Sequence, residues 1–262
     1  MEENNLVKNN LQKVLHKSGE HVSYHQINGD APNIIFLHGL MSDMNGTKAL
    51  AIENFAKENH QGFIRFDCRG HGQSSGSFPN YGIDDWAEDA ELILTKLTTG
   101  PQILIGSSMG GWSMLLTALK QRHRIGGLIG IAAAPDFTHD NAWKKLKQDH
   151  NDELNKKGYI ELPSAYKDSP YIISKTLIDS GDNHLLLNKT INLDCPIRLL
   201  HGLDDKDVSI EKSLKLIKCI KSQDATLTIV KDSDHQFSSD QNIELIIEKI
   251  KELTQVIKQK LI

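Results

Sequence analysis

Residues 102 to 119 of this chain read QILIGSSMGGWSMLLTAL, and this stretch decides the fold that we expect. An apolar run with strand character leads into Gly106, and a run with helical spacing follows Gly110. Between them Ser108 occupies the centre of a G-x-S-x-G pattern, which at a strand-to-helix turn is typical of a nucleophile elbow. The alternative is a glycine-rich turn in which Ser108 only caps the helix. The stretch predicts an α/β fold that presents Ser108 as a nucleophile.

Strand-like and helix-like patterns alternate on both sides of this elbow. Residues 11–17 and 21–27, joined by Ser18-Gly19-Glu20, predict an opening hairpin. In the remainder of the chain, the alternation of strand-like and helix-like patterns predicts a mostly parallel central sheet with helices on both faces. The expected strands are 33–37, 62–66, 102–105, 127–132, 196–201 and 226–230, and the expected helices are 47–59, 84–97, 110–119, 210–220 and 240–260.

The alternation of strand-like and helix-like patterns is interrupted between residues 136 and 190. This stretch is rich in Lys, Asp and Asn with aromatic residues interspersed, and it has no apolar run typical of a buried strand. We interpret residues 136–190 as a mainly helical cap inserted into a single α/β domain that spans residues 1–262. Because the insert precedes the strand at 196–201, we expect the cap to cover the sheet edge at which Ser108 emerges.

The loop after the strand at 196–201 offers three aspartates as the acid that would orient a catalytic base. The pattern G-x-x-D-x-x-V, read from Gly202, selects Asp205. We interpret Asp204 and Asp207 as solvated loop or helix-capping carboxylates. Asp205 is therefore the predicted acid.

The loop after the next strand supplies the candidate base, His235. It lies 30 residues beyond Asp205, about one strand–helix–strand unit, so both side chains are expected at the same edge of the sheet. The chain order Ser, Asp, His is the one expected after a nucleophile elbow. Two other histidines, His38 and His201, directly precede glycines at strand ends, where we expect them to brace loops.

An acyl-transfer reaction also needs two N–H donors for the oxyanion that forms on the carbonyl. The Met109 amide directly follows the candidate nucleophile. The Leu40 amide lies in the loop after the strand at 33–37, where Gly39 permits a close approach. Met109 and Leu40 are therefore the predicted oxyanion donors.

A second glycine-rich motif, DCRGHGQS at residues 67–74, fills the loop after the strand at 62–66. Its glycines predict a tight turn. We interpret Asp67 and Arg69 within it as structural ion-pair members rather than as catalytic groups.

Composition excludes several other classes of protein. The chain carries 30 Lys plus Arg against 34 Asp plus Glu, a net charge of -4, which gives no positive field for nucleic acid. Apolar runs such as 127–134 are far shorter than the roughly 20 residues that a membrane helix needs. Cys68, Cys195 and Cys219 match no metal motif and cannot all pair, which favours a reducing compartment. No metal or organic cofactor is expected, and no pattern sets the oligomeric state.

The first ten residues, MEENNLVKNN, lack the apolar core of a secretory signal. The first arginine is Arg65, which argues against a mitochondrial transit peptide. We therefore expect a cytoplasmic protein.

Together these residues resemble the α/β-hydrolase superfamily over nearly the whole chain from about residue 11. Within it, several segments resemble the mitochondrial branch of palmitoyl-protein thioesterases and acyl-glucuronide esterases. The resemblance implies that Ser108 is the nucleophile, Asp205 the acid and His235 the base. The missing transit peptide suggests a bacterial-type counterpart of that branch. The segments are MNGTKALAIE (44–53), GPQIL (100–104), GSSMGGW (106–112), CPIRLLHG (195–202) and SDH (233–235).

Motif order and resemblance predict a serine hydrolase that cleaves an acyl thioester or ester, in a small molecule or an S-acylated protein, through an acyl-Ser108 intermediate. The alternative of the same class is a carboxylesterase for small esters or acyl glucuronides. The remote alternative is a non-catalytic ligand-binding protein on this scaffold.

The cap is expected to bind the acyl chain, since it should lie over Ser108. Any one of its apolar side chains could equally anchor the cap to the body. The candidate pocket residues are Trp143, Leu146, Tyr171 and Ile172 from the cap, together with Met41 and Met109 from the loops of the main domain.

Overall fold

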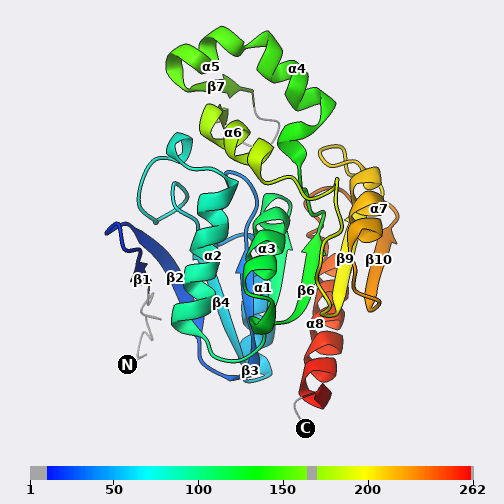
Figure 1. The fold of residues 1–262 in the computed structure, drawn as a ribbon. Helices are drawn as coiled ribbons and strands as arrows, with labels where there is room; N and C mark the ends of the chain where they lie inside the picture. Colours follow the sequence, from blue (N-terminus) through cyan, green and yellow to red (C-terminus); the bar gives the residue numbers. More distant parts are fainter. Residues whose placement is uncertain (1–10, 164–169, 261–262) are drawn as a thin grey trace, which may run out of the picture.

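The computed structural model describes residues 11–163 and 170–260, so part of the predicted cap lies outside the described residues. An eight-stranded sheet forms its centre, in the order β1-β2-β4-β3-β5-β6-β9-β10 (Figure 1). β2 pairs antiparallel with both β1 and β4, whereas all neighbours from β4 to β10 are parallel. The strands are β1 (Gln12–Leu15), β2 (His21–Ile27), β3 (Asp30–Leu37), β4 (Gln61–Asp67), β5 (Gln102–Ser107), β6 (Ile125–Ile131), β9 (Ile197–Gly202) and β10 (Ala225–Val230).

Helices cover both faces of this sheet, which is why its central strands are mostly apolar. Successive side chains of a strand point to opposite faces, so Ile34 packs into one buried cluster and Ile35 into the other. α1 (Thr47–Glu58) and α8 (Asp240–Lys260) cover one face, and α2 (Ile83–Leu97), α3 (Met109–Lys120) and α7 (Ile210–Cys219) cover the other. The short helices η1 (Phe78–Asn80) and η2 (Arg122–Arg124) lie in the connections. The predicted α/β architecture is confirmed.

The direction in which the sheet grows reverses between β3 and β5, because β4 follows β3 in the chain but β5 pairs on its other side. Open α/β sheets bind ligands outside the carboxyl ends of the strands at such a switch point. The loops after β3 and β5 carry Leu40 and Ser108. The loops after β9 and β10 reach the same edge and carry Asp205 and His235.

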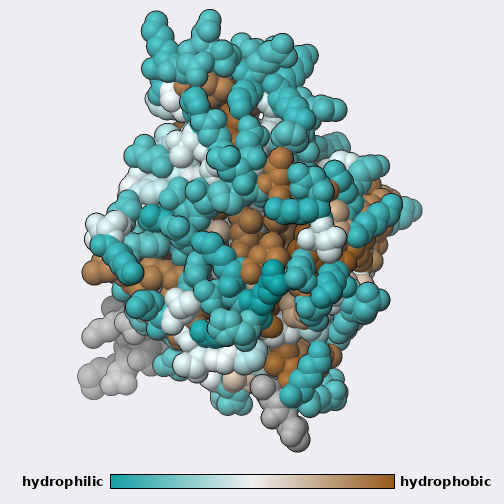
Figure 2. Space-filling model, in the orientation of Figure 1, coloured by the Kyte–Doolittle hydropathy of each residue, from teal (hydrophilic) through white to brown (hydrophobic). Residues whose placement is uncertain are grey.

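The cap lies above this carboxyl edge (Figure 1). It contains helices, as the sequence predicts, and also a two-stranded antiparallel sheet, which the sequence analysis did not expect. A small apolar cluster of its own joins Leu154, Ile160, Ile173 and Ile178. The outer surface of the cap is dominated by hydrophilic side chains (Figure 2). Its elements are η3 (Phe137–His139), α4 (Asn141–Asp149), α5 (Asn151–Lys157), β7 (Tyr159–Leu162), β8 (Tyr171–Ser174) and α6 (Lys175–Asn183).

Asp136 fastens the base of the cap. Its backbone is left-handed, with φ at 59°. Its carboxylate accepts hydrogen bonds from the amides of Leu186 and Leu187, both at 2.8 Å. The beginning and the end of the cap are therefore tied to each other where they leave the body.

Within residues 11–163 and 170–260, none of the helices combines the length and the apolar character needed to cross a bilayer.

Candidate active site

Ser108 stands at a strained turn between β5 and α3. Its φ is 53° and its ψ is -119°, a conformation that non-glycine residues rarely adopt. The turn is possible because its neighbours are small. A Cβ at Gly106 would lie 2.4 Å from the carbonyl oxygen of Gly110, and one at Gly110 would lie 2.3 Å from the carbonyl oxygen of Leu37. Strain of this kind, held in place by surrounding backbone, is characteristic of functional sites.

Replacing Gly110 by alanine is expected to lower the free energy of unfolding by about 1–3 kcal/mol, because the new methyl group meets backbone that cannot move aside. Gly46→Ala is the matched control, since a Cβ there finds its nearest neighbour at 3.8 Å, an ordinary contact. Urea denaturation of both variants checks the prediction. Equal stability of the two variants would show that the elbow has room to relax.

His235 connects Ser108 with Asp205 through both of its ring nitrogens. Its Nε2 lies 3.1 Å from Ser108 Oγ, and its Nδ1 lies 2.8 Å from Asp205 Oδ2. A carboxylate can only accept, so Nδ1 carries the proton and Nε2 is left to accept from the serine hydroxyl. The structure thus brings together the three predicted residues in the geometry of a nucleophile, a base and an acid.

The buried carboxylate of Asp205 is held in its charged form. Only 1% of its side chain is exposed. Burial by itself would raise its pKa, but hydrogen bonds from His235 and from the amides of Val208 and Asp207 outweigh it and lower the pKa below its ordinary value. The other oxygen of the Asp205 carboxylate, Oδ1, accepts hydrogen bonds from Asp207 N at 2.9 Å and from Val208 N at 2.8 Å. This carboxylate can orient His235 and stabilise its imidazolium form.

His201 braces the same loop, as the sequence analysis expected. Its ring nitrogens lie 2.7 Å from Ser213 Oγ and 2.9 Å from the carbonyl oxygen of Val208. Burial lowers its pKa, so the ring is kept neutral although it lies 3.4 Å from Asp205 Oδ2.

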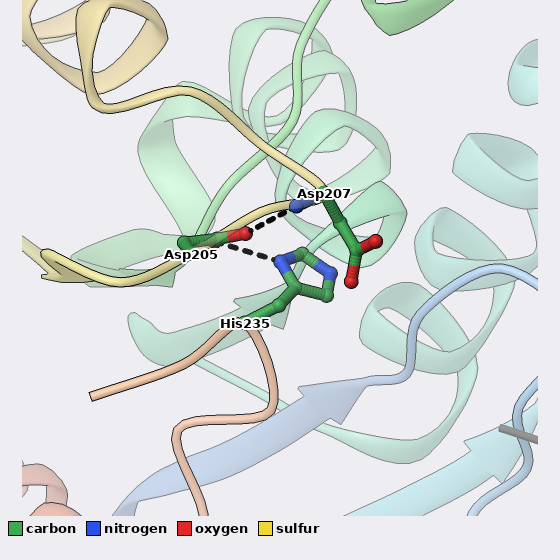
Figure 3. Close-up of side chains that lie close together, drawn as sticks. All are labelled: Asp205, Asp207 and His235. Carbon is green, nitrogen blue, oxygen red and sulfur yellow. Dashed lines mark hydrogen bonds and ion pairs between the residues drawn. The ribbon is translucent and has the colours of Figure 1, made fainter. Parts of the chain in front are cut away.

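Asp207 lies closer to the site than the sequence analysis expected. It is exposed, as a loop carboxylate should be, but its side chain lies beside the imidazole of His235 (Figure 3). Ligand atoms of Asp205, Asp207 and His235 fall within 4.8 Å of one another, a grouping that could hold a metal ion. A metal there would compete for the same atoms that join Asp205 to His235 and so would oppose the hydrogen-bonded chain.

The two predicted oxyanion donors belong to the two segments that meet at Ser108. Met109 is the next residue and the first of α3, so its amide belongs to the helix N-terminus. Leu40 lies in the loop after β3, which packs against the elbow: a Cβ at Gly39 would lie 3.5 Å from Ser108 Cβ. Both amides are therefore in the neighbourhood that an oxyanion on a Ser108 adduct would occupy.

The predicted pocket residues separate into two groups. Met41 and Ile172 meet beside the loop that carries Leu40, where Ile172 N lies 3.2 Å from Met41 Sδ. Burial and the charge of Asp207 both raise the pKa of the Tyr171 hydroxyl.

The other two predicted pocket residues take part in anchoring the cap. Leu146 packs against the cap's own cluster. Trp143 contacts both this cluster and the main core, with its ring edge-on to Phe137 at 4.9 Å. For Leu146 the structure thus favours the anchoring alternative.

The prediction that Arg69 is a structural ion-pair member is confirmed, whereas the carboxylate of Asp67 accepts backbone hydrogen bonds instead of the predicted ion pair. Arg69 pairs with Asp89 of α2, at 2.7 Å, and also with Glu20. The carboxylate of Asp67 instead accepts from the amides of Met44 and Gln73 at 2.7 and 2.9 Å. Both groups are structural, but they act in different contacts.

Lys48 is a neighbour of the candidate base that was not predicted from the sequence. Lys48 Nζ donates to the carbonyl oxygen of Gln236, the residue after His235. Burial lowers the pKa of Lys48 to about 8. The segment MNGTKALAIE, which contains Lys48, was recognised by its resemblance to known proteins. Its sequence does not reveal that Lys48 contacts the loop of His235, which lies far away in the chain.

Comparisons with known proteins agree with the fold described above. A family model described as alpha/beta hydrolase fold matches residues 32–176. The mitochondrial palmitoyl-protein thioesterase ABHD10 of Rattus norvegicus is 39% identical over 233 residues, which cover 88% of this chain and 78% of the relative.

Two solved structures are similar over nearly their full length. Alpha/beta hydrolase domain-containing protein 10 from mouse is 36% identical with a TM-score of 0.85, over 93% of this chain and 97% of that one. A protein from Agrobacterium vitis S4 is 32% identical with a TM-score of 0.88, over 93% of this chain and 98% of that one.

Proposed function

The chain belongs to the α/β-hydrolase fold family, and from this premise we propose that it is a serine hydrolase that cleaves acyl thioesters or esters with Ser108 as nucleophile. One observation carries the proposal. The Ser108 hydroxyl, at a strained elbow, is joined through His235 to a buried, charged Asp205. Such a chain serves to remove the hydroxyl proton as the oxygen attacks.

The reaction has two halves. Ser108 Oγ attacks the acyl carbonyl carbon while His235 Nε2 takes its proton, and the Met109 and Leu40 amides stabilise the oxyanion. The C–S or C–O bond then breaks, and His235 returns the proton to the leaving thiolate or alkoxide. In the second half His235 deprotonates a water molecule that attacks acyl-Ser108, which releases the carboxylic acid and restores the hydroxyl.

We propose long-chain S-acyl thioesters as the substrate class. The support is the likeness, over 88% of this chain, to relatives named palmitoyl-protein thioesterase. The triad itself does not separate thioesters from oxygen esters, because both pass through similar tetrahedral intermediates. The distinction therefore has to come from the cap and the pocket.

The experiment compares kcat/KM for a palmitoyl thioester and its matched oxygen ester, alongside labelling of the protein by a fluorophosphonate. The proposal expects labelling at Ser108 and a higher kcat/KM for the thioester. Labelling with a preference for the oxygen ester would support the carboxylesterase alternative. If the protein were not labelled and turned over neither substrate, the proposal would be contradicted altogether.

The cap is expected to bind the acyl chain, since its strand β8 reaches Met41 beside Leu40. A pocket wall contributes about 0.8 kcal/mol per buried methylene, so kcat/KM should rise roughly three- to fourfold per CH₂ until the pocket is full. Replacing the segment between Asp136 and Leu186 by a short Gly-Ser linker should flatten this dependence. The linker is geometrically feasible because Asp136 and Leu186 already bond to each other at 2.8 Å.

A series of p-nitrophenyl esters of increasing chain length measures the dependence in both proteins. Reaction of the shortened protein with a small fluorophosphonate serves as the control that Ser108 still functions. An unchanged chain-length slope in a folded, reactive protein would place the acyl chain outside the cap.

A further inference from the structure

The glycine-rich motif at residues 67–74 takes no part in the proposed chemistry, yet it contacts the loop that carries Leu40. Asp67 anchors the far end of that loop, because its Oδ1 accepts from Met44 N at 2.7 Å. Asp67 is 1% exposed, so this bond is shielded from water. The motif is therefore a support beneath residues 38–44.

Two imidazoles connect the motif with the loop on either side of Leu40. Cys68 N lies 3.1 Å from Nε2 of His38, two residues before Leu40. Met41 N, directly after Leu40, lies 3.2 Å from Nε2 of His71. The Leu40 amide thus lies between two points at which a histidine ring holds the chain.

The partners of His71 determine which of its nitrogens carries the proton. A backbone amide can only donate, so Nε2 must offer its lone pair to Met41 N. Nδ1 lies 3.3 Å from the carbonyl oxygen of Arg69, which can only accept. The same reasoning applies to His38, whose Nδ1 lies 2.8 Å from the carbonyl oxygen of Gly39. Both rings are therefore neutral and accept through Nε2.

Aromatic packing fixes the plane of the His71 ring. The residue is 5% exposed. His38, Phe78 and Trp86 meet it edge-on, with ring centroids at 4.8, 5.1 and 5.2 Å. A ring held in this way presents its lone pair in one fixed direction.

The backbone at Met41 needs such support. Its φ is 52°, in the left-handed region that costs a non-glycine residue free energy. If this peptide relaxed, the direction of the adjoining Leu40 N–H would change with it. An oxyanion donor acts only when it is already in place as the charge develops.

We propose that His71 is a positioning residue that fixes the Leu40 amide for the oxyanion by accepting the hydrogen bond of Met41 N. The inference rests on the proposed function, because it assigns a role within that reaction. His71 does not touch the substrate. It acts through the loop, so its removal should weaken stabilisation of the transition state and leave substrate binding nearly intact.

The test compares variants that keep or remove the acceptor. His71→Gln retains an uncharged acceptor, whereas His71→Phe and His71→Leu remove it and keep apolar packing against Phe78 and Trp86. On a short-chain p-nitrophenyl ester, the apolar variants should lose about 10- to 100-fold in kcat with KM within about threefold. The Gln variant should retain kcat within about fivefold of wild type. The apolar variant used is the one whose melting temperature stays at that of the wild type.

His184→Phe is the matched control. His184 also bonds a backbone carbonyl through Nδ1, at 2.8 Å from Ser180 O, but it lies after α6 in the cap. Its kcat should stay near that of wild type. Apolar variants with kcat within threefold of wild type would overturn the proposal, as would a Gln variant that loses as much as they do. Turnover by the wild type tests the proposed function separately, because only ratios to the wild type test His71.

Discussion

Replacing Ser108 by alanine is expected to lower kcat for the proposed hydrolysis by about 10⁴- to 10⁶-fold while the protein stays folded. The hydroxyl oxygen is the atom that forms the acyl bond, and it is the oxygen that lies 3.1 Å from His235 Nε2. Alanine keeps the Cβ and faces the same φ of 53°, so the strain at the turn does not change. The expected loss is therefore chemical and not structural.

Ser113→Ala is the matched control for this variant. Ser113 is a buried serine on α3, the helix that begins at the elbow, and its Oγ has no hydrogen-bond partner among the residues that the structure describes. Its removal should change neither kcat nor stability appreciably. Steady-state rates and thermal unfolding of both variants give the answer. A Ser108→Ala rate within tenfold of wild type, with contaminating esterase excluded, would exclude Ser108 as the nucleophile.

The parts of the site that could be predicted from the sequence lie at the ends of buried parallel strands. Such strands appear as apolar runs because helices cover both of their faces, so β5 and β9 were recognisable and the loops that follow them could be searched. The spacing after β9 then selected Asp205, which the structure places against His235. Local pattern and position along the chain suffice to predict a site residue when its motif directly follows a strand.

Contacts between segments far apart in the chain could not be predicted in the same way. Arg69 pairs with Asp89, which is 20 residues away on α2, and no local pattern distinguishes it from the nearer Asp67. The strands β7 and β8 have four residues each, too few for an alternating pattern to stand out. Leu146 belongs to an apolar cap helix face, but sequence periodicity does not tell whether such a face meets a pocket or a second core.

Replacing Asp205 by asparagine is expected to lower kcat by about 10³- to 10⁴-fold, the second largest effect. Oδ1 accepts from two backbone amides and Oδ2 accepts from His235. An asparagine that keeps its oxygen toward the backbone turns its NH₂ group toward Nδ1, which must then give up its proton and accept. The proton moves to Nε2, where it faces Ser108, and the base is lost.

Asp204→Asn is the control, because it removes the same charge from an exposed neighbour in the same loop and should cost less than tenfold. The lowered pKa of Asp205 adds a prediction on stability. Its charge stabilises the fold at any pH above the value of an unperturbed aspartate, about 3.9, and this contribution disappears as the pH falls through the lowered pKa. Wild type and Asp205→Asn should therefore differ in melting temperature near pH 7 and converge in strong acid. A severe loss of kcat in Asp204→Asn, with Asp205→Asn active, would show that the acid had been assigned to the wrong aspartate.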